Sequence, residues 1–239
     1  MAKSKLIITL MVFGMITLLC RLGFWQLSRS QEKQAQINQW QHNEQLPPVS
    51  NEFLVSHPKA LPNLRYLPIR ITTEFLNQNT ILIDNKIHKG RVGYYVYVPA
   101  VLDDNTVILI NRGWIPLGHS RNSLPQPSVT RGQVTIEGYL DFAYRNRFIK
   151  DMIESNQWPL RMQQLDIELL SKRLGKEVYP MLVMLNASSP YVFAPQEAPV
   201  EWLNPKRHQG YAVQWFGLAF TLLILYLFYF FRSGKGGAR

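Results

Sequence analysis

Cysteine is almost absent from this sequence: Cys20 is the single one among 239 residues. It stands in an apolar stretch near the N-terminus, so the rest of the chain can form no internal disulfide bond. The same lack removes the paired thiolates that copper(I) sites favour. A disulfide-stabilised secreted fold and a copper chaperone are therefore both disfavoured.

Catalytic sequence motifs are also missing. The chain contains no G-x-S-x-G, no H-E-x-x-H, no Walker loop and no G-x-G-x-x-G. The adjacent acids Asp103 and Asp104 lie in a turn-like "LDDNT" rather than in a catalytic setting. We therefore expect a protein that is not an enzyme, with an anchored hydrolase as the least favoured alternative. The remaining histidines outside the C-terminal segment are scattered without metal-ligand spacing: His42, His57, His88 and His119.

Acidic residues are lacking at both ends of the chain. The formal net charge is +10, and much of it comes from Lys3 and Lys5 at one end and Arg232, Lys235 and Arg239 at the other. The middle of the chain has only a mild basic excess and no basic runs. This distribution argues against nucleic acid as a partner.

The C-terminal apolar run has no charged residue and no histidine from Gln209 to Phe231, which is 23 residues. A helix of that length is about 34 Å long, enough for a hydrocarbon core of about 30 Å. The run therefore predicts a transmembrane helix over residues 209–231, with the lipid bilayer as its surroundings.

The N-terminal apolar run is shorter, because only Leu6 to Cys20 is free of charge. No small-residue cleavage pattern follows it, and Leu19 stands where a lipoprotein signal needs a small residue. Arg21 can extend its charged end to the membrane surface, and Trp25 is a typical interfacial residue. We expect an uncleaved transmembrane helix over residues 6–25.

The basic tips set the expected orientation. The positive-inside rule places both termini in the cytoplasm and residues 27–206 outside it. The N-terminus lacks the long Arg- and Ser-rich leader of a mitochondrial precursor. We therefore expect a bacterial inner-membrane protein with two transmembrane helices and a periplasmic domain between them.

The middle segment reads as a domain rich in strands. Its polar first part, up to Pro47 and Pro48, is compatible with a continuation of the first helix. Turn residues separate the strand-like runs that follow, so we expect a β-rich (α+β) domain, with a barrel-like arrangement as one form it could take. The runs are 65–75, 80–87, 93–102, 106–116, 133–142, 179–186 and 190–195.

One soluble helix is predicted within this domain. Asp166 is a suitable N-cap, Glu168 favours the positive helix start, and Gly175 suits the position after the helix end. The expected buried stripe consists of Leu169, Leu170 and Leu174.

Two short segments have alternative interpretations. His208 stands just before the second apolar run, with Tyr211 and Trp215 on the same helical face. These three residues are either an ordinary interfacial belt or a ligand site. Arg112 and Trp114, in "NRGW", either pack at a strand end or contact a partner protein.

Six segments, taken in order, resemble the Surfeit locus protein 1 family, a group of cytochrome c oxidase assembly factors. The resemblance runs from about Leu22 to Phe220 and includes both apolar helices. The segments are "LGFWQLSR", "ILIDNKIHKGRVGYYVYVPAV", "VILINRGWIP", "VTIEGYL", "NQWPLRMQQLDIELLSKRLG" and "RHQGYAVQWFGLAF".

The resemblance implies assembly work rather than turnover. Family members assist maturation of the haem-bearing catalytic subunit of the oxidase, and bacterial ones bind haem a. The family's haem-ligand histidine corresponds to His208, and imidazole is a suitable axial ligand for haem iron. Tyr211 and Trp215 would then flank the porphyrin, and Arg207 would meet a propionate.

The expected function is therefore that of an assembly factor that binds haem a and assists its insertion into the catalytic subunit. The enzyme that makes haem a is a further candidate partner. The alternative is a cofactor-free scaffold that stabilises an oxidase intermediate, with Arg112 and Trp114 at the contact. Haem content of the purified protein separates the two hypotheses.

Overall fold

A computed structural model describes residues 2–59, 61–118, 123–143, 145–146, 157–195 and 203–235. The chain divides into two compact units. One unit contains residues 1–39 and 198–239, and the other contains residues 40–197. His119 lies outside the described residues.

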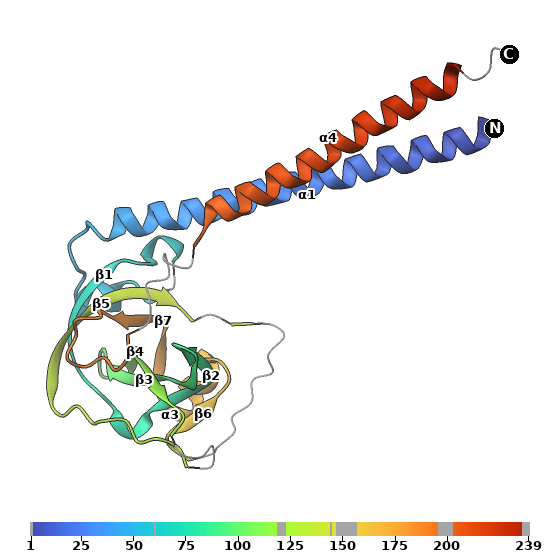
Figure 1. Ribbon diagram of the computed structural model, residues 1–239. Coiled ribbons are helices and arrows are strands. Elements are labelled where there is room, and N and C mark those ends of the chain that lie inside the picture. The colour runs from blue at the N-terminus through green and yellow to red at the C-terminus, as the bar shows by residue number, and fades with distance from the viewer. Residues whose placement is uncertain are drawn as a thin grey trace. The chain divides into compact units, whose positions relative to one another are not determined.

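Two long helices make up the first unit (Figure 1). They are α1, Ala2–Asn43, of which the last turn belongs to the second unit, and α4, Pro205–Lys235. Both are long and apolar enough to cross a bilayer. α4 begins at Pro205 because the Asn204 side chain accepts a hydrogen bond from the Arg207 backbone N–H, at 3.0 Å, and proline suits the first helical position.

The two helices run antiparallel and contact each other along a seam. Hydrogen bonds between described residues cross the seam along its length: Thr9 with Tyr226, Gln26 with His208, and Ser30 with the carbonyl of Pro205. On each helix, buried or half-buried positions alternate at intervals of three and four residues, the period at which two helices stay in contact. In α1 they are Thr9, Val12, Ile16, Leu19, Gly23, Gln26 and Ser30; in α4 they are Pro205, His208, Ala212, Trp215, Ala219, Leu222 and Tyr226.

A mixed sheet of seven strands forms the second unit (Figure 1). The strands lie in the order β1-β5-β7-β4-β3-β2-β6. The β4–β7 and β2–β6 pairs are parallel and the other four pairs are antiparallel. The strands are β1 Pro68–Glu74, β2 Ile81–His88, β3 Arg91–Val101, β4 Thr106–Pro116, β5 Gln133–Phe142, β6 Leu160–Met162 and β7 Glu177–Leu185.

Short helices complete the domain. They are α2 Asn51–Ser56, the 3₁₀ turns η1 Pro62–Leu64 and η2 Asn77–Asn79, and α3 Ile167–Leu174. The predicted caps of α3 are confirmed, since Asp166 accepts from the Leu169 N–H at 3.0 Å and Gly175 has a left-handed φ of 64°. Leu170 is fully buried, and Leu169 and Leu174 pack partly buried beside it.

The barrel-like arrangement is not what the described residues form. Their sheet is open, with β1 and β6 as its two edges. β6 is too short to continue the ladder, because it has three residues and pairs only with β2. Beyond the end of β1, one isolated bridge, Phe75 with Ala100, approaches β3. The predicted strand over 190–195 is also wrong: it contributes a single bridge, Ala194 with Trp114.

The sheet has an apolar core on each face. In β4, Ile108 and Ile110 point into one core, while Val107 and Leu109 point into the other. A strand covered on both sides reads as a continuous apolar run rather than as an alternation. That is why "VILI" is uninterrupted here.

The β1 edge is covered locally by the preceding chain. Val49 bridges Ile69 in parallel, and the side-chain amide of Asn51 continues the pattern. Its Nδ2 donates to the carbonyl of Thr72 at 3.0 Å, and its Oδ1 accepts from the Thr72 N–H at 3.1 Å. Asn51 therefore occupies backbone groups that an open edge would expose.

Candidate functional site

His208 lies in the first turn of α4, half-buried on the helix seam. Its Nδ1 is 2.7 Å from Oε1 of Gln26 in α1. In the described ranges, no group is hydrogen-bonded to its Nε2. One nitrogen of this imidazole is therefore held by the neighbouring helix, and the other is available to a ligand.

The other predicted cofactor residues lie around His208 in different settings. Trp215 is half-buried on the same seam, two turns further along α4. Tyr211 is 38% exposed and lies outside the seam. Arg207 is exposed, and its Nε donates to the hydroxyl of Tyr211 at 3.4 Å. The structure thus places His208 and Trp215 on one stripe, with Tyr211 and Arg207 paired beside it.

Small side chains allow the helices to approach closely next to His208. A Cβ added to Gly23 would lie 2.6 Å from Cζ of Phe216, so the Phe216 ring occupies that space. Phe24 contacts the same ring edge-on, with 5.2 Å between ring centroids. Ala212 and Ala219 are buried on the facing stripe. This packing resembles the small-residue contacts of membrane helices.

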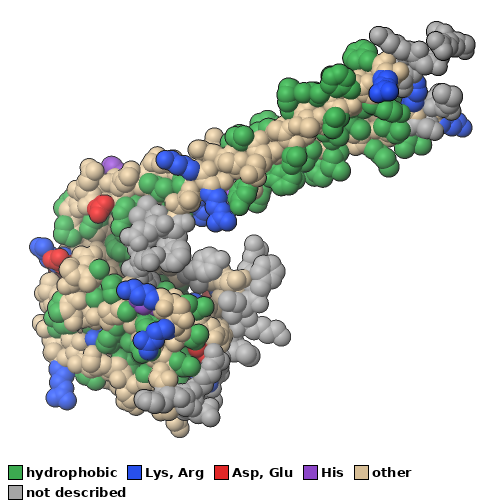
Figure 2. Space-filling view, viewed as in Figure 1, with side chains coloured by type: hydrophobic (Ala, Val, Ile, Leu, Met, Phe, Trp, Pro, Cys, Tyr) green, Lys and Arg blue, Asp and Glu red, His purple; other side chains and the backbone are tan. Residues whose placement is uncertain are grey.

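The outer surfaces of the two helices are apolar over their predicted transmembrane runs, residues 6–25 and 209–231 (Figure 2). Phe13 is 71% exposed and Phe228 is 72% exposed. In water such surfaces would be unfavourable, so they suit a lipid environment.

The predicted partner residue Arg112 is buried in the domain, with 3% of its surface exposed. Its Nε donates to the Tyr191 carbonyl at 2.9 Å and its Nη1 to the Ser128 carbonyl at 2.8 Å. The guanidinium also lies 4.5 Å from the ring centroid of Phe193. Burial lowers the pKa of Arg112 to about 10.

Trp114 is buried as well, with 6% exposed. Its Nε1 donates to the carbonyl of Lys86 at 2.9 Å, and its ring lies 5.2 Å from that of His88. Neither Arg112 nor Trp114 presents its side chain at the domain surface, so both hold neighbouring segments together. Direct contact of either residue with a partner stays a prediction.

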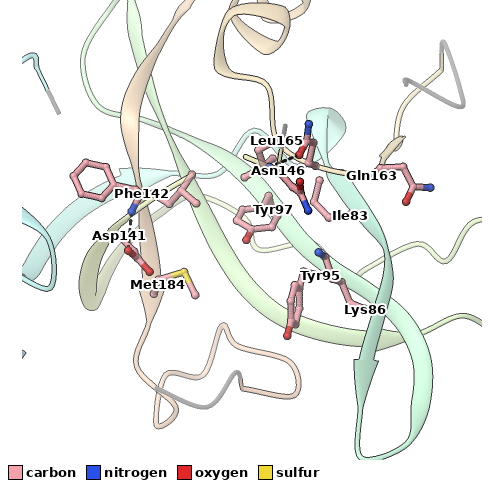
Figure 3. Close-up of a pocket in the computed structure, with 12 residues that line it drawn as sticks. Ile83, Lys86, Tyr95, Tyr97, Asp141, Phe142, Asn146, Gln163, Leu165 and Met184 are labelled. Atoms are coloured by element: carbon pink, nitrogen blue, oxygen red, sulfur yellow. Dashed lines mark hydrogen bonds between the residues drawn. The ribbon is translucent and has the colours of Figure 1, made fainter. Parts of the chain in front are cut away.

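The domain also contains a cavity of about 260 Å³ that sequence reasoning missed (Figure 3). A bulge in β2 shifts the pairing register between Ile83 and Lys86, with Asn85 at a left-handed φ of 58°. Because a bulge changes which face a side chain points to, Lys86 lines the cavity. Burial lowers the pKa of Lys86. Tyr97 forms part of the wall; its hydroxyl accepts from Nδ2 of Asn111 at 3.0 Å, and burial raises its pKa.

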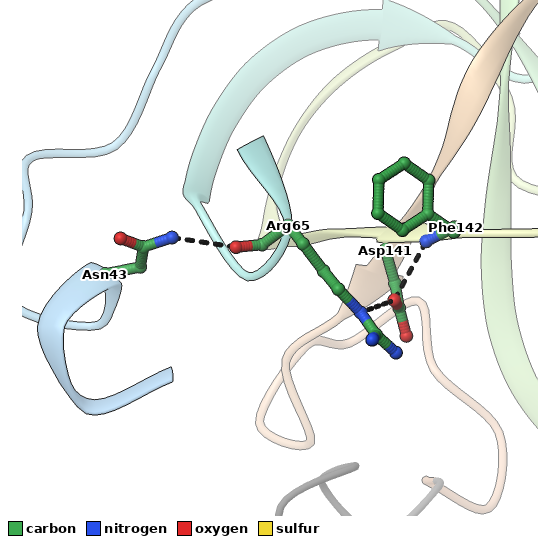
Figure 4. A network of polar contacts seen from close by, with 4 residues as sticks. All are labelled: Asn43, Arg65, Asp141 and Phe142. Atoms are coloured by element: carbon green, nitrogen blue, oxygen red, sulfur yellow. Dashed lines mark hydrogen bonds and ion pairs between the residues drawn. The ribbon is translucent and has the colours of Figure 1, made fainter. Parts of the chain in front are cut away.

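Asp141, which lines this cavity, forms an ion pair with Arg65; Figure 4 shows the pair and its neighbours. Nε of Arg65 donates to Oδ1 of Asp141 at 2.7 Å, and the same oxygen accepts from the Phe142 N–H at 2.8 Å. Nδ2 of Asn43 donates to the carbonyl of Arg65 at 2.7 Å. This network attaches the last turn of α1 to the domain strands and has a structural role.

The described residues form no group of three or more His, Cys, Asp or Glu side chains that could hold a metal ion. Two features described above offer a group that could bind a ligand: the histidine on the helix seam and the amine of Lys86 in the small cavity.

Gln26 is the residue at the first site that sequence reasoning missed. It lies inside the quoted "LGFWQLSR", but its role depends on which α1 residue faces His208. The available signal was the alternating spacing of Gly23, Gln26 and Ser30, which marks one face of the helix.

Comparison with known proteins agrees with the motif order. The sequence profile of the SURF1 family matches residues 13–220. A SURF1-like protein of Rickettsia conorii is 28% identical over 226 residues, covering 92% of this chain and 89% of that protein. Surfeit locus protein 1 of Homo sapiens is 25% identical over 233 residues, covering 90% and 75%. The resemblance expected from the motifs is confirmed, and the chain belongs to the SURF1 family.

Proposed function

We propose that this protein is a membrane-anchored assembly factor for cytochrome c oxidase that binds haem a through His208 and assists its insertion into the catalytic subunit. The observation that carries the proposal is the state of His208, whose Nδ1 is bound by Gln26 while Nε2 has no partner in the described ranges. Membership of the SURF1 family supports the assembly role. The haem is cargo here, and its redox chemistry belongs to the oxidase that receives it.

The residues around His208 fit such a cargo. A neutral imidazole nitrogen is a suitable ligand for haem iron. Lys206 and Arg207 are exposed next to it, where cations can pair with propionates. The apolar outer faces of α1 and α4 offer a surface for a hydrophobic tail. A single protein ligand also suits handover, because the same site must bind and release.

The proposed location is a bacterial inner membrane. Basic residues at both tips favour cytoplasmic termini and a periplasmic domain. In that orientation His208 would lie near the outer surface of the bilayer, since it precedes the charge-free run of α4. The enzyme that makes haem a is a further proposed partner, because so apolar a haem would need direct transfer.

The test is the reduced-minus-oxidised visible spectrum of the protein purified from cells that make haem a. We expect a haem a band in the wild type that is lost in His208→Ala. His42→Ala is the matched control, because His42 is an exposed histidine on α1, and its spectrum should equal that of the wild type.

Two outcomes would redirect the proposal. No band in any of the three proteins would favour the cofactor-free scaffold. A band that persists in His208→Ala would make another residue the ligand.

A further inference from the structure

The contact between Gln26 and His208 joins two half-buried side chains across the helix seam. Both stand at seam positions, and the donor–acceptor distance is 2.7 Å. The next layer holds a second cross-helix hydrogen bond, from Oγ of Ser30 to the carbonyl of Pro205 at 3.0 Å. On the other side the Phe216 ring packs over Gly23. The helix spacing at His208 is therefore fixed from both sides.

The chemistry of this contact determines the tautomer of His208. A carboxamide oxygen can only accept a hydrogen bond. With Oε1 of Gln26 facing it, Nδ1 must carry the proton, and Nε2 of the neutral ring then has a free lone pair. We infer that Gln26 is a positioning residue that holds His208 as the Nδ1–H tautomer and so presents Nε2 to an incoming haem iron. This inference rests on the proposed function.

The neutrality of Gln26 has its own consequence. A carboxylate at this position would make the imidazole a stronger ligand, as it does in permanent metal sites. An amide orients the ring with less effect on its basicity. An amide partner, which leaves the imidazole a weaker ligand than a carboxylate would, therefore suits a site that must release its haem.

The tautomer can be measured without haem. Full-length protein in detergent, with isotope-labelled histidine, would be examined by NMR at about pH 8.5, where histidine side chains are neutral. The His208 signals are those that disappear in His208→Ala. We expect the Nδ1–H form in the wild type and the Nε2–H form, which histidine favours in water, in Gln26→Leu.

Two further variants separate hydrogen bonding from packing. Gln26→Glu keeps an accepting oxygen and should keep a lone pair on Nε2. Gln31→Leu is the control, because Gln31 is exposed on the same helix, and it should leave the His208 signals unchanged. An Nε2–H form in the wild type, or an unchanged His208 signal in Gln26→Leu, overturns the inference.

Haem a titration then relates the tautomer to binding. We expect Gln26→Leu to weaken binding by roughly 10- to 100-fold, the usual effect of losing the group that orients a ligand histidine, and Gln26→Glu to bind at least as tightly as the wild type. Equal affinities of Gln26→Leu and wild type overturn the link to haem. If neither binds haem while the NMR result holds, the tautomer assignment stands and the proposed function fails.

Discussion

Similar apolar residues are exposed on the helix pair and buried in the domain. In α1, Leu10, Met11 and Phe13 are 64%, 70% and 71% exposed. In β4, Ile108, Leu109 and Ile110 are fully buried. The first run faces outward along its whole circumference except for one narrow seam, whereas the second is covered by a core on each face. Local hydrophobicity thus indicates that a segment avoids water. It does not indicate whether the segment is buried in a protein core or left with an apolar surface that suits lipid.

The comparison predicts that substitutions at fully packed positions of the domain cost more than substitutions on the helix seam. The sharpest case is Gly138→Ala in β5, because the added Cβ would lie 2.1 Å from the carbonyl oxygen of Met184. Backbone of a paired strand cannot yield as a side chain can, so we expect a loss of about 3 kcal/mol or more in unfolding free energy. Chemical denaturation followed by circular dichroism measures it. A loss under about 1 kcal/mol would mean that β5 and β7 separate easily.

The next effect concerns the buried guanidinium. Arg112→Met removes the donors to two carbonyls, Tyr191 and Ser128. Relief from burying a charge offsets part of the loss, so we expect about 2 kcal/mol of destabilisation in the same measurement. Arg112→Lys should not restore the wild-type value, because an ammonium cannot match the two directions of the guanidinium. Full recovery with lysine would show that charge alone matters.

The seam gives a smaller effect. Gly23→Ala meets the Phe216 ring, which is the movable end of a side chain, so we expect a loss of about 1 kcal/mol. Gly14→Ala is the control on the same helix, because a Cβ there meets nothing within 4 Å. Titration with SDS in mixed micelles, followed by tryptophan fluorescence, compares the two. Equal curves for both variants would place the helix contact elsewhere.

The smallest effect is expected at the cavity. Lys86→Met should stabilise the domain by up to about 1 kcal/mol, because burial lowers the pKa of Lys86 and so disfavours its charged form. The Lys86 pKa is lower in the folded protein than in the unfolded chain, where it has the ordinary lysine value of about 10.4. As the pH rises toward that value, the folded protein loses the proton first, so the unfolded state binds more protons. The unfolding free energy of the wild type therefore rises with pH. Unfolding curves at increasing pH should show this rise in the wild type and not in the variant. A destabilised Lys86→Met would mean that the contact of the Lys86 ammonium with the Tyr95 ring, 5.8 Å from its centroid, outweighs the cost of burying the charge.

Much of the domain was predictable because its strands carry strong local patterns. The run 106–116 is long, apolar and rich in β-branched residues, and it forms β4. α3 was marked at both ends by Asp166 and Gly175. The β6 strand was missed because three residues give no period, and its pairing with β2 is set by tertiary contacts. The stretch 190–195 was predicted as a strand because of its aromatic content, but it forms a single isolated bridge to β4 and no continuous ladder.

The site was predictable in part. His208 stood out because a polar ring precedes a long apolar run. Gln26 could not be assigned from its neighbours, since its partner is 182 positions away in the chain. The inward side chain of Lys86 depends on a bulge, and Arg112 and Trp114 are conspicuous in the sequence yet buried in the fold. The contact of Gln26, the direction of Lys86 and the burial of Arg112 and Trp114 depend on helix pairing and strand register, and neither is a property of neighbouring residues.

The covered β1 edge limits how a partner can recognise the domain. With Val49 and Asn51 attached to β1 and only three residues in β6, the described sheet offers little free backbone for strand addition at either margin. Recognition by backbone pairing accepts many sequences, whereas recognition by side chains discriminates among them. Any protein that binds this domain would therefore be selected by the shape and polarity of its own surface rather than by strand addition at these two edges.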